Sequence, residues 1–314
     1  MASPNESTLQ VGRRLPDLFR ILCWIAGAGV VLVLGWIIVE IAQSAWPAIS
    51  KFGLEFLSNS AWVPNRERFG VFPFIIGTIS SSAIAMLFAF PLGLAIAIFL
   101  SEDFLPLPVR QTVRFVVEML AAIPSVVYGL WGIFVVIPIV KTIGDWTTER
   151  FGTVPIFEGP TYGNSLLTAS LVLALMILPT LTAISRNALA AVPPALREGA
   201  YALGATRWEA ILGVILPTAA PGVVAATILA LGRAMGETMA VAMLIGNSSR
   251  PSWSIFAPSG TLAGLLANQF GEASGLQVNS LMYAALILVV ITLGVNLVGE
   301  WVLRVTRRRT EGIR

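Results

Sequence analysis

The stretch EGAYALGATRWEAILGVILP, residues 198–217, lies between two strongly hydrophobic segments and is itself too polar to be buried in a membrane. Two prolines precede it, and proline suits the first turn of a helix because an N–H has no helical partner there. Gly204 follows, and glycine is common where a helix ends in the left-handed conformation. Thr206 and Glu209 have the spacing of a capping box. The stretch therefore predicts two short helices joined by a glycine turn.

Apolar residues recur on one face of each expected helix, as helical periodicity requires. In the first helix they are Leu196, Ala200 and Leu203. In the second helix they are Trp208, Ile211, Leu212, Ile215 and Leu216. Pro217 is expected to end the second helix before the next hydrophobic segment begins.

This stretch resembles the EAA loop of ABC importer permeases, whose pattern is E-A-A, three residues, G, nine residues, I, one residue and L-P. Gly199 and Val214 replace an Ala and the Ile of that pattern. In that family the loop docks in a groove on a cytoplasmic ATPase. The resemblance assigns this coupling role to Glu198, Gly199, Ala200, Gly204, Ala205, Thr206, Arg207, Trp208, Glu209, Leu216 and Pro217. The alternative is an amphipathic hairpin that lies on the membrane surface.

The composition indicates a membrane protein. The chain of 314 residues is 56% hydrophobic and 12% charged, with a mean hydropathy of +0.82, whereas soluble domains carry about 25% charged residues. No histidine occurs, which excludes histidine acid–base catalysis, histidine metal sites and histidine proton relays. A single cysteine, Cys23, excludes a disulfide within the chain. No G-x-x-x-x-G-K-[ST] pattern occurs, so the chain is not itself an ATPase.

The hydrophobic segments predict an all-α polytopic protein with six transmembrane helices. The predicted spans are about 21–42, 72–100, 113–140, 162–185, 218–245 and 280–303. They form one domain, 21–303, which includes a coupling loop at 186–217. Residues 1–20 are expected to be a loosely ordered tail and 304–314 a basic tail. Pro124 predicts a kink in the third span, and Trp46 and Trp62 are expected at a membrane interface.

The placement of basic residues predicts the orientation. Of the 20 Lys and Arg residues, thirteen lie on the side of the N-terminus, six on the other side and one inside a span. The positive-inside rule therefore places both termini in the cytoplasm. The arginine cluster of the C-terminal tail is expected to contact lipid, and no nucleic-acid partner is expected.

The fifth predicted span contains a charged pair within LGRAMGETMAV. Arg233 lies near the middle of that span, where a charge needs a partner or a wet cavity. Glu237 is four residues on, on the same helical face, and can pair with it. Gly232 and Gly236 form a G-x-x-x-G pair, and another row of small residues is Gly222, Ala226, Ala230 and Ala234. Small residues let another helix approach closely. The pair is either a structural ion pair or an anion site.

The segments GRAMGETMAVAMLIGN and AAIPSVVYGLWG, together with the EAA loop, resemble the PstC-type permeases of the phosphate-specific ABC transport system. The resemblance covers most of the chain and implies the type I ABC importer permease fold, in the inner membrane of a bacterium. It implies that Arg233 and Glu237 lie on a phosphate path. It also implies a PstA-type permease partner, two PstB-type ATPases that bind ATP and Mg²⁺, and a PstS-type periplasmic phosphate-binding protein. This chain would bind no cofactor or metal itself.

Other functions remain open from the residues alone. The nearest alternatives are an ABC permease for another oxyanion, such as sulfate or molybdate, and a proton-coupled carrier. A membrane enzyme and a signalling scaffold are further classes. The lack of histidine and the scarcity of carboxylates within the spans count against a carrier and an enzyme.

Overall fold

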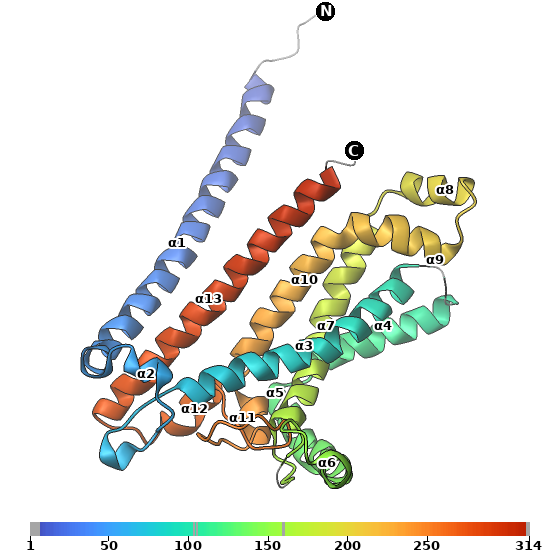
Figure 1. The fold of residues 1–314 in the computed structure, drawn as a ribbon. Helices are drawn as coiled ribbons and strands as arrows, with labels where there is room; N and C mark the ends of the chain where they lie inside the picture. Colours follow the sequence, from blue (N-terminus) through green and yellow to red (C-terminus); the bar gives the residue numbers. More distant parts are fainter. Residues whose placement is uncertain (1–6, 103, 105, 159–160, 312–314) are drawn as a thin grey trace, which may run out of the picture.

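The computed structural model describes residues 7–102, 104, 106–158 and 161–311, with side chains from 18 to 306 within these ranges. The regular elements of these residues are all helical (Figure 1), apart from one isolated bridge between Val63 and Arg68. Six helices are long and apolar enough to cross a membrane: Leu18–Phe52, Phe72–Ser101, Ser125–Phe151, Leu166–Ala190, Arg207–Gly236 and Leu276–Thr306. The predicted all-α fold with six membrane-spanning helices is confirmed.

The helices follow one another along the chain, joined by short connections except for the loops 152–165 and 245–261. In the first half they are α1 (Ser7–Phe52), α2 (Glu55–Ser58), the 3-10 turn η1 (Pro64–Arg66), α3 (Phe72–Ser101), α4 (Leu107–Ala122), α5 (Ser125–Trp131), the π turn η2 (Gly132–Val136) and α6 (Ile137–Phe151). In the second half they are α7 (Leu166–Ala190), α8 (Pro194–Ala202), α9 (Arg207–Ala210), the π turn η3 (Ile211–Ile215), α10 (Leu216–Gly236), α11 (Met239–Leu244), α12 (Leu262–Gln269) and α13 (Leu276–Glu311).

Helix α7 forms the centre of the main core, where it packs against both α3 and α10. Its large, fully buried side chains are Leu173, Ile177, Leu181 and Leu189. The predicted row of small residues on α10 makes the contact with α7. A Cβ atom on Gly222 would lie 2.3 Å from the Cβ atom of Ala188, and the three alanines of the row are buried. The two backbones approach closely because these side chains are small.

A second core lies at the opposite end of the bundle from α8, where residues 53–71 fold against α12 and α13 (Figure 1). The Nε1 of Trp62 donates to the Oε1 of Gln269 at 2.6 Å, and the ring of Phe56 stacks on that of Tyr283 with centroids 4.5 Å apart. Trp62 is therefore buried in the protein, whereas Trp46 is exposed; a position of either ring at a membrane interface stays a prediction. The indole N–H of Trp62 has a hydrogen-bond partner in the protein, which a buried indole N–H usually requires.

The outermost helices extend beyond the predicted spans. Helix α1 begins at Ser7, inside the stretch predicted as a loosely ordered tail, and α13 continues to Glu311, through most of the predicted basic tail. Residues 1–6 and 312–314 of those two tails lie outside the described residues. A polar composition indicates where the chain leaves the hydrocarbon core of a membrane. It does not end a helix, because arginine and glutamate are good helix formers. The limits of the spans within the lipid stay a prediction.

The third predicted span is divided by a break. Helix α4 ends at Ala122, Ile123 is extended (φ −71°, ψ 127°), and α5 begins after Pro124. The residue before a proline avoids the α conformation, which accounts for the break. The hydroxyl of Tyr128 donates to the carbonyl of Leu120 at 2.8 Å and so joins the two sides. The kink predicted at Pro124 is confirmed, but the membrane-length helix runs from 125 to 151 instead of 113 to 140.

Each π turn directly precedes a helix with proline in its first turn. Turn η2 ends at Val136 before Pro138, and η3 ends at Ile215 before Pro217. A proline removes one N–H and crowds the carbonyl four residues earlier. A π turn widens the helix at that point, which relieves the crowding. The helix from 207 to 236 is therefore continuous, and the break predicted at Pro217 is wrong.

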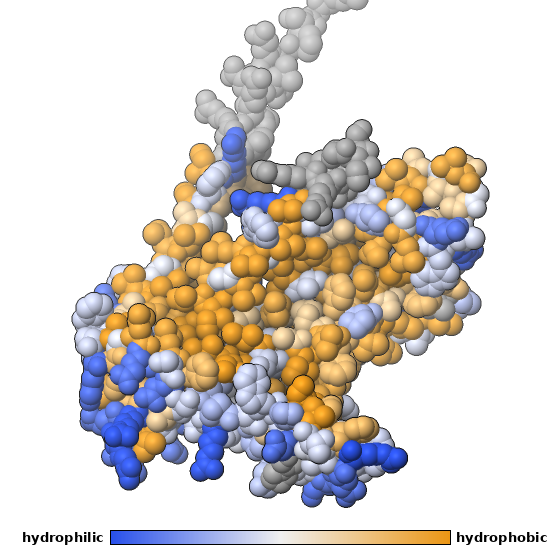
Figure 2. All heavy atoms as spheres, in the orientation of Figure 1, coloured by the Kyte–Doolittle hydropathy of each residue, from blue (hydrophilic) through white to orange (hydrophobic). Residues whose placement is uncertain are grey.

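The surface is divided into an apolar band and two polar ends. Figure 2 shows hydrophobic residues across the middle of the molecule and hydrophilic ones gathered at the end formed by α2, α6 and α12. Hydrophilic residues also occur around α8 and α9 at the other end. The start of α1, the end of α13 and the α8–α9 hairpin share that second end (Figure 1). This distribution is the one expected of a protein that spans a bilayer.

Candidate functional site

The α8–α9 hairpin is built by local interactions that the sequence specifies. Gly204 has a φ of +84°, its N–H donates to the carbonyl of Tyr201 at 3.0 Å, and the N–H of Ala205 donates to the carbonyl of Ala200 at 3.1 Å. These two hydrogen bonds form a Schellman motif, which ends a helix when the next residue takes the left-handed conformation. Glycine accepts that conformation without steric cost. The predicted glycine turn is confirmed.

The capping box at the start of α9 is also confirmed. The N–H of Thr206 donates to the Oε2 of Glu209 at 2.7 Å, and the N–H of Glu209 donates to the Oγ1 of Thr206 at 3.4 Å. Two backbone donors that a helix start leaves unpaired are satisfied in this way. The turn between α8 and α9 is thus fixed from both sides.

The apolar residues of the hairpin face two directions. Ala200, Ile211 and Ile215 are buried against the bundle, whereas Leu203 at the turn is 91% exposed. Other exposed apolar side chains on the hairpin and on η3 are Leu196, Tyr201, Trp208 and Leu212. The predicted stripes therefore divide into a face that holds the hairpin on the protein and a face that is open to a partner.

The remaining residues assigned to the coupling loop lie around this open face. Glu198 and Gly199 are exposed, and a Cβ atom on Gly199 would meet no atom within 4 Å. The guanidinium of Arg207 lies 5.8 Å from the ring centroid of Phe104. At the start of α10, Pro217 is exposed and Leu216 is half-buried against the core formed by Ile211 and Ile215.

The second candidate region surrounds Arg233 on α10. Its Nη1 donates to the Oγ1 of Thr180 on α7 at 3.2 Å. Helix α10 ends at Gly236, and Glu237 is extended with φ −68° and ψ 126°. We predicted that Glu237 shares a helical face with Arg233 because the fifth span was expected to be one helix. That prediction is wrong, since the helix ends before Glu237. Within the described residues, the ion pairs do not include one between these two side chains.

Two interrupted helices meet near Arg233. The break between α10 and α11 lies at residues 237 and 238, and α11 packs on α5, which follows the break at Pro124. A Cβ atom on Gly129 of α5 would lie 2.6 Å from the sulfur of Met243, so a larger residue here would require the Met243 side chain to move. Non-helical backbone at membrane depth is tolerated where protein covers it or where it lines a cavity.

A cavity of about 370 Å³ lies beside the break between α4 and α5 at Pro124. Its lining residues are Leu120, Ile123, Val127, Tyr128, Trp131 and Leu175. Gly232, on the same helix as Arg233, lies next to α13, because a Cβ atom there would be 3.4 Å from the Oδ1 of Asn296. A Cβ atom on Gly236 would meet nothing within 4 Å. Helix packing at this pair of glycines stays a prediction.

Several residues around these sites were not identified from the sequence. Glu102 pairs with Arg197, Phe104 stacks on Trp208, and Thr180 binds Arg233. These partners are far apart in the chain, and no periodic pattern connects them. The SEDF segment in a short polar loop was the one available signal for Glu102 and Phe104. Among the described residues, no group of three or more His, Cys, Asp or Glu side chains has the arrangement of a metal site.

The chain is similar to known transport proteins. Residues 89–312 match the family described as binding-protein-dependent transport system inner membrane component. The chain is 42% identical to the phosphate transport system permease protein PstC of Mesorhizobium japonicum, over 98% of this chain and 96% of that protein. It is 42% identical to the protein of the same name from Haemophilus influenzae, over 84% of this chain and 85% of that protein. The probable phosphate transport system permease protein PstC of Methanocaldococcus jannaschii is 36% identical, over 87% of this chain and 88% of that protein.

Solved structures share the fold at lower identity. A permease chain of a bacterial alginate ABC transporter, in complex with an alginate pentasaccharide-bound periplasmic protein, has a TM-score of 0.56 at 16% identity, with 95% of this chain and 98% of that chain covered. A chain of the MetNI methionine ABC transporter in an inward-facing conformation has a TM-score of 0.54 at 20% identity, with 76% and 94% covered. The ABC importer permease fold that the sequence predicts is confirmed.

Proposed function

Because this chain belongs to the binding-protein-dependent transport system inner membrane components and, among them, to the PstC-type permeases, we propose that it is the membrane-spanning subunit of an ATP-driven importer of inorganic phosphate. It is a multi-pass inner membrane protein and a transport subunit, not an enzyme. Its partners are other components of an ABC importer. In the proposed complex they are a PstA-type permease, two PstB-type ATPases and a PstS-type phosphate-binding protein.

The observation that carries the phosphate assignment is the position of Arg233. This residue lies near the end of α10, beside an interruption of the helix, and its guanidinium makes one hydrogen bond to the hydroxyl of Thr180. A guanidinium has five donors in a planar fork and binds a tetrahedral oxyanion bidentately. The hydrogen bond to the neutral hydroxyl of Thr180 holds the Arg233 side chain in place and leaves its other N–H donors for phosphate.

Glu237 has a different role in this proposal from the one expected of an ion-pair partner. Its backbone lies in the break between α10 and α11, so its carboxylate is placed by an extended segment and not by the helix that carries Arg233. A carboxylate on the path repels a phosphate dianion and weakens binding. Weak binding allows phosphate to leave the path, as transport requires.

The α8–α9 hairpin couples the permease to the ATPase. Its exposed leucine at the turn and the neighbouring apolar side chains form a surface that a groove on the ATPase would bury. Removal of this apolar area from water favours association. ATP and Mg²⁺ bind to the ATPase subunits in this proposal, and this chain binds neither.

The hairpin and both chain ends are proposed to face the cytoplasm. The hairpin, the start of α1 and the end of α13 share one end of the bundle (Figure 1), and the excess of basic residues predicted on that side fits the positive-inside rule. The opposite end, formed by α2, α6 and α12, then faces the periplasm and the phosphate-binding protein.

We expect cysteine labelling to follow this orientation. In a Cys23→Ser background, single cysteines at Ser60, Arg150 and Arg250 should react with an impermeant maleimide added to spheroplasts. A cysteine in place of Arg304, whose side chain near the end of α13 is 72% exposed, should react after the cells are permeabilised and not before. Labelling of Arg304→Cys in intact spheroplasts would reject the orientation.

The proposed function is tested by transport in vesicles. The purified complex, reconstituted with ATP inside and the phosphate-binding protein outside, should accumulate radioactive phosphate, and omission of ATP should abolish uptake. Uptake of sulfate or molybdate in place of phosphate would identify the alternative oxyanion. Uptake driven by a proton gradient without ATP would identify a carrier and contradict the proposal.

A further inference from the structure

The end of α3 carries an acidic residue where a helix disfavours one. Glu102 follows the last residue of α3, its N–H donates to the carbonyl of Ile98 at 3.0 Å, and 9% of the residue is exposed. The partial negative charge at a helix C-terminus and the loss of water both disfavour a carboxylate at this position. A positive charge must therefore offset it.

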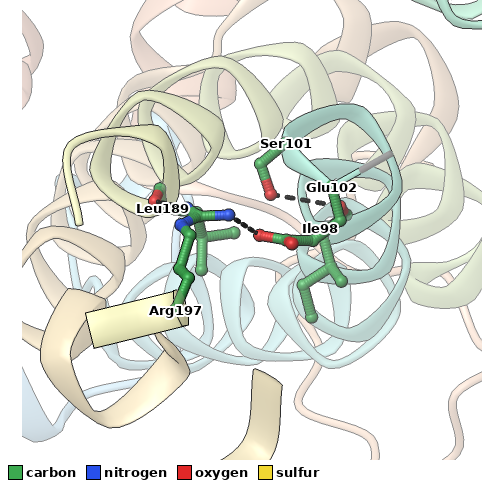
Figure 3. A network of polar contacts seen from close by, with 5 residues as sticks. All are labelled: Ile98, Ser101, Glu102, Leu189 and Arg197. Atoms are coloured by element: carbon green, nitrogen blue, oxygen red, sulfur yellow. Dashed lines mark hydrogen bonds and ion pairs between the residues drawn. The ribbon is translucent and has the colours of Figure 1, made fainter. Parts of the chain in front are cut away.

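Arg197 of α8 supplies that charge and reaches two helices (Figure 3). Its Nη1 pairs with the Oε1 of Glu102, and its Nη2 donates to the carbonyl of Leu189 on α7 at 2.7 Å. The N–H of Val192 also donates to that carbonyl, at 3.3 Å, and Pro193, four positions after Leu189, has no N–H to offer. The side chains of Arg197 and Glu102 are 19% and 11% exposed. One guanidinium thus connects α8 to the ends of both α3 and α7.

A second contact holds the hairpin by packing alone. The ring of Trp208 on α9 stacks on that of Phe104 with centroids 5.3 Å apart. Between this stack and the ion pair lies a cavity of about 230 Å³, lined by Glu102, Phe104, Arg197, Tyr201, Arg207 and Ile211. The charge-assisted hydrogen bonds of Arg197 are strong and have a defined direction. A movement of α8 is therefore passed on through Arg197.

Helix α7 connects the end that Arg197 holds to the middle of the bundle. Thr180 lies nine residues before Leu189, about 14 Å along the helix axis, and binds Arg233. Thr182 of α7 donates from its Oγ1 to the carbonyl of Gly93 on α3 at 3.4 Å, so α3 and α7 are also connected there. Such packed helices move as rigid elements.

We infer that Glu102 and Arg197 form a positioning pair, which transmits movement of the α8–α9 hairpin to α3 and α7 and, through Thr180, to Arg233. The inference rests on the proposed function, because it concerns the step between ATP hydrolysis and the phosphate path. Neither side chain contacts phosphate or ATP in this role. Without the pair, the ATPase still binds the hairpin and hydrolyses ATP, but α3 and α7 follow the hairpin less closely, because the apolar packing of Ile211 and Ile215 is then the main remaining connection.

The ratio of phosphate imported to ATP hydrolysed tests this inference. In vesicles that contain the whole complex, Glu102→Gln and Arg197→Gln should retain ATPase binding and hydrolysis but lower this ratio at least fivefold. The double Gln variant should be no worse than either single one, because the two residues act as a unit. The reversed pair, Glu102→Arg with Arg197→Glu, should recover part of the ratio. A wild-type ratio in the single variants, or a reversed pair as defective as they are, would overturn the inference.

The exposed pair of Glu300 and Arg304 on α13, 3.0 Å apart, is the matched control. Its Gln variants should keep the wild-type ratio. If the Gln variants of the positioning pair do not assemble, Glu102→Asp and Arg197→Lys are expected to assemble with a lowered ratio, and a wild-type ratio in them rejects the inference. Absence of ATP-dependent uptake in the wild-type complex would contradict the proposed function instead, so the two failures are distinguishable.

Discussion

Replacement of Arg233 by glutamine is expected to lower phosphate uptake by the reconstituted complex roughly ten- to a hundredfold, because a hydrogen bond to a charged group contributes about 1.5–3 kcal/mol. Glutamine keeps a polar side chain of similar reach but has no charge and no planar fork of donors. Arg233→Lys should also lose much of the transport, since an ammonium cannot bind phosphate bidentately. Uptake of radioactive phosphate into vesicles measures both effects.

The hydrogen bond to Thr180 separates a role in the path from a role in packing. Thr180→Val removes the hydroxyl that holds Arg233 and keeps the charge and nearly the same volume. We expect this variant to lose less than Arg233→Gln, because the guanidinium remains available to phosphate. Arg114, an exposed arginine with an exposed glutamate partner 2.7 Å away, is the matched control, and Arg114→Gln should transport phosphate normally.

The double variant Arg233→Gln with Glu237→Gln distinguishes an ion pair from a substrate site. If the two charges stabilised each other, their joint removal would restore assembly and much of the uptake. A substrate site predicts a complex that assembles and transports phosphate near background. The extended backbone at Glu237 favours the second result, and uptake close to wild type in the double variant would reject the path assignment.

The α8–α9 hairpin shows which features a sequence specifies locally. The hydrogen bonds of its turn and of its cap join residues at most five positions apart, and Gly204, Thr206 and Glu209 each have one dominant conformational or hydrogen-bonding preference. Hydropathy likewise determines the number of spans, because about 20 apolar residues are needed to cross the hydrocarbon core. Both features could be predicted because neither requires a distant partner.

The connections between helices could not be predicted in this way. Arg197 and Glu102 are separated by 95 positions, and Arg233 and Thr180 by 53. No periodic pattern spans such distances, so each pair can be recognised only once the packing of the helices is known. The end of α10 at Gly236 was also missed, since glycine is frequent in membrane helices and is by itself a weak breaker. This error produced the expected ion pair with Glu237.

Gly204→Val is expected to lower the amount of ATPase that co-purifies with the permease roughly five- to a hundredfold. The residue has a φ of +84°, and a β-branched side chain there stores strain of about 1–3 kcal/mol. A Cβ atom at this position would meet no atom within 4 Å, so the cost comes from the backbone and not from a clash. The hairpin can relieve the strain by opening the turn, which removes the Schellman hydrogen bonds and displaces Leu203 from the open face.

Gly199→Ala is the matched control for that variant. Gly199 is also exposed with open space around its Cβ position, but it lies inside α8, where its φ is not positive. Alanine is favoured over glycine inside a helix by about 0.5–1 kcal/mol, so this variant should bind the ATPase at least as well as the wild type. If Gly204→Val co-purifies with normal amounts of ATPase and transports phosphate normally, the hairpin is not the coupling element. If both glycine variants lose the ATPase, the effect belongs to any added side chain on this face and not to the conformation of the turn.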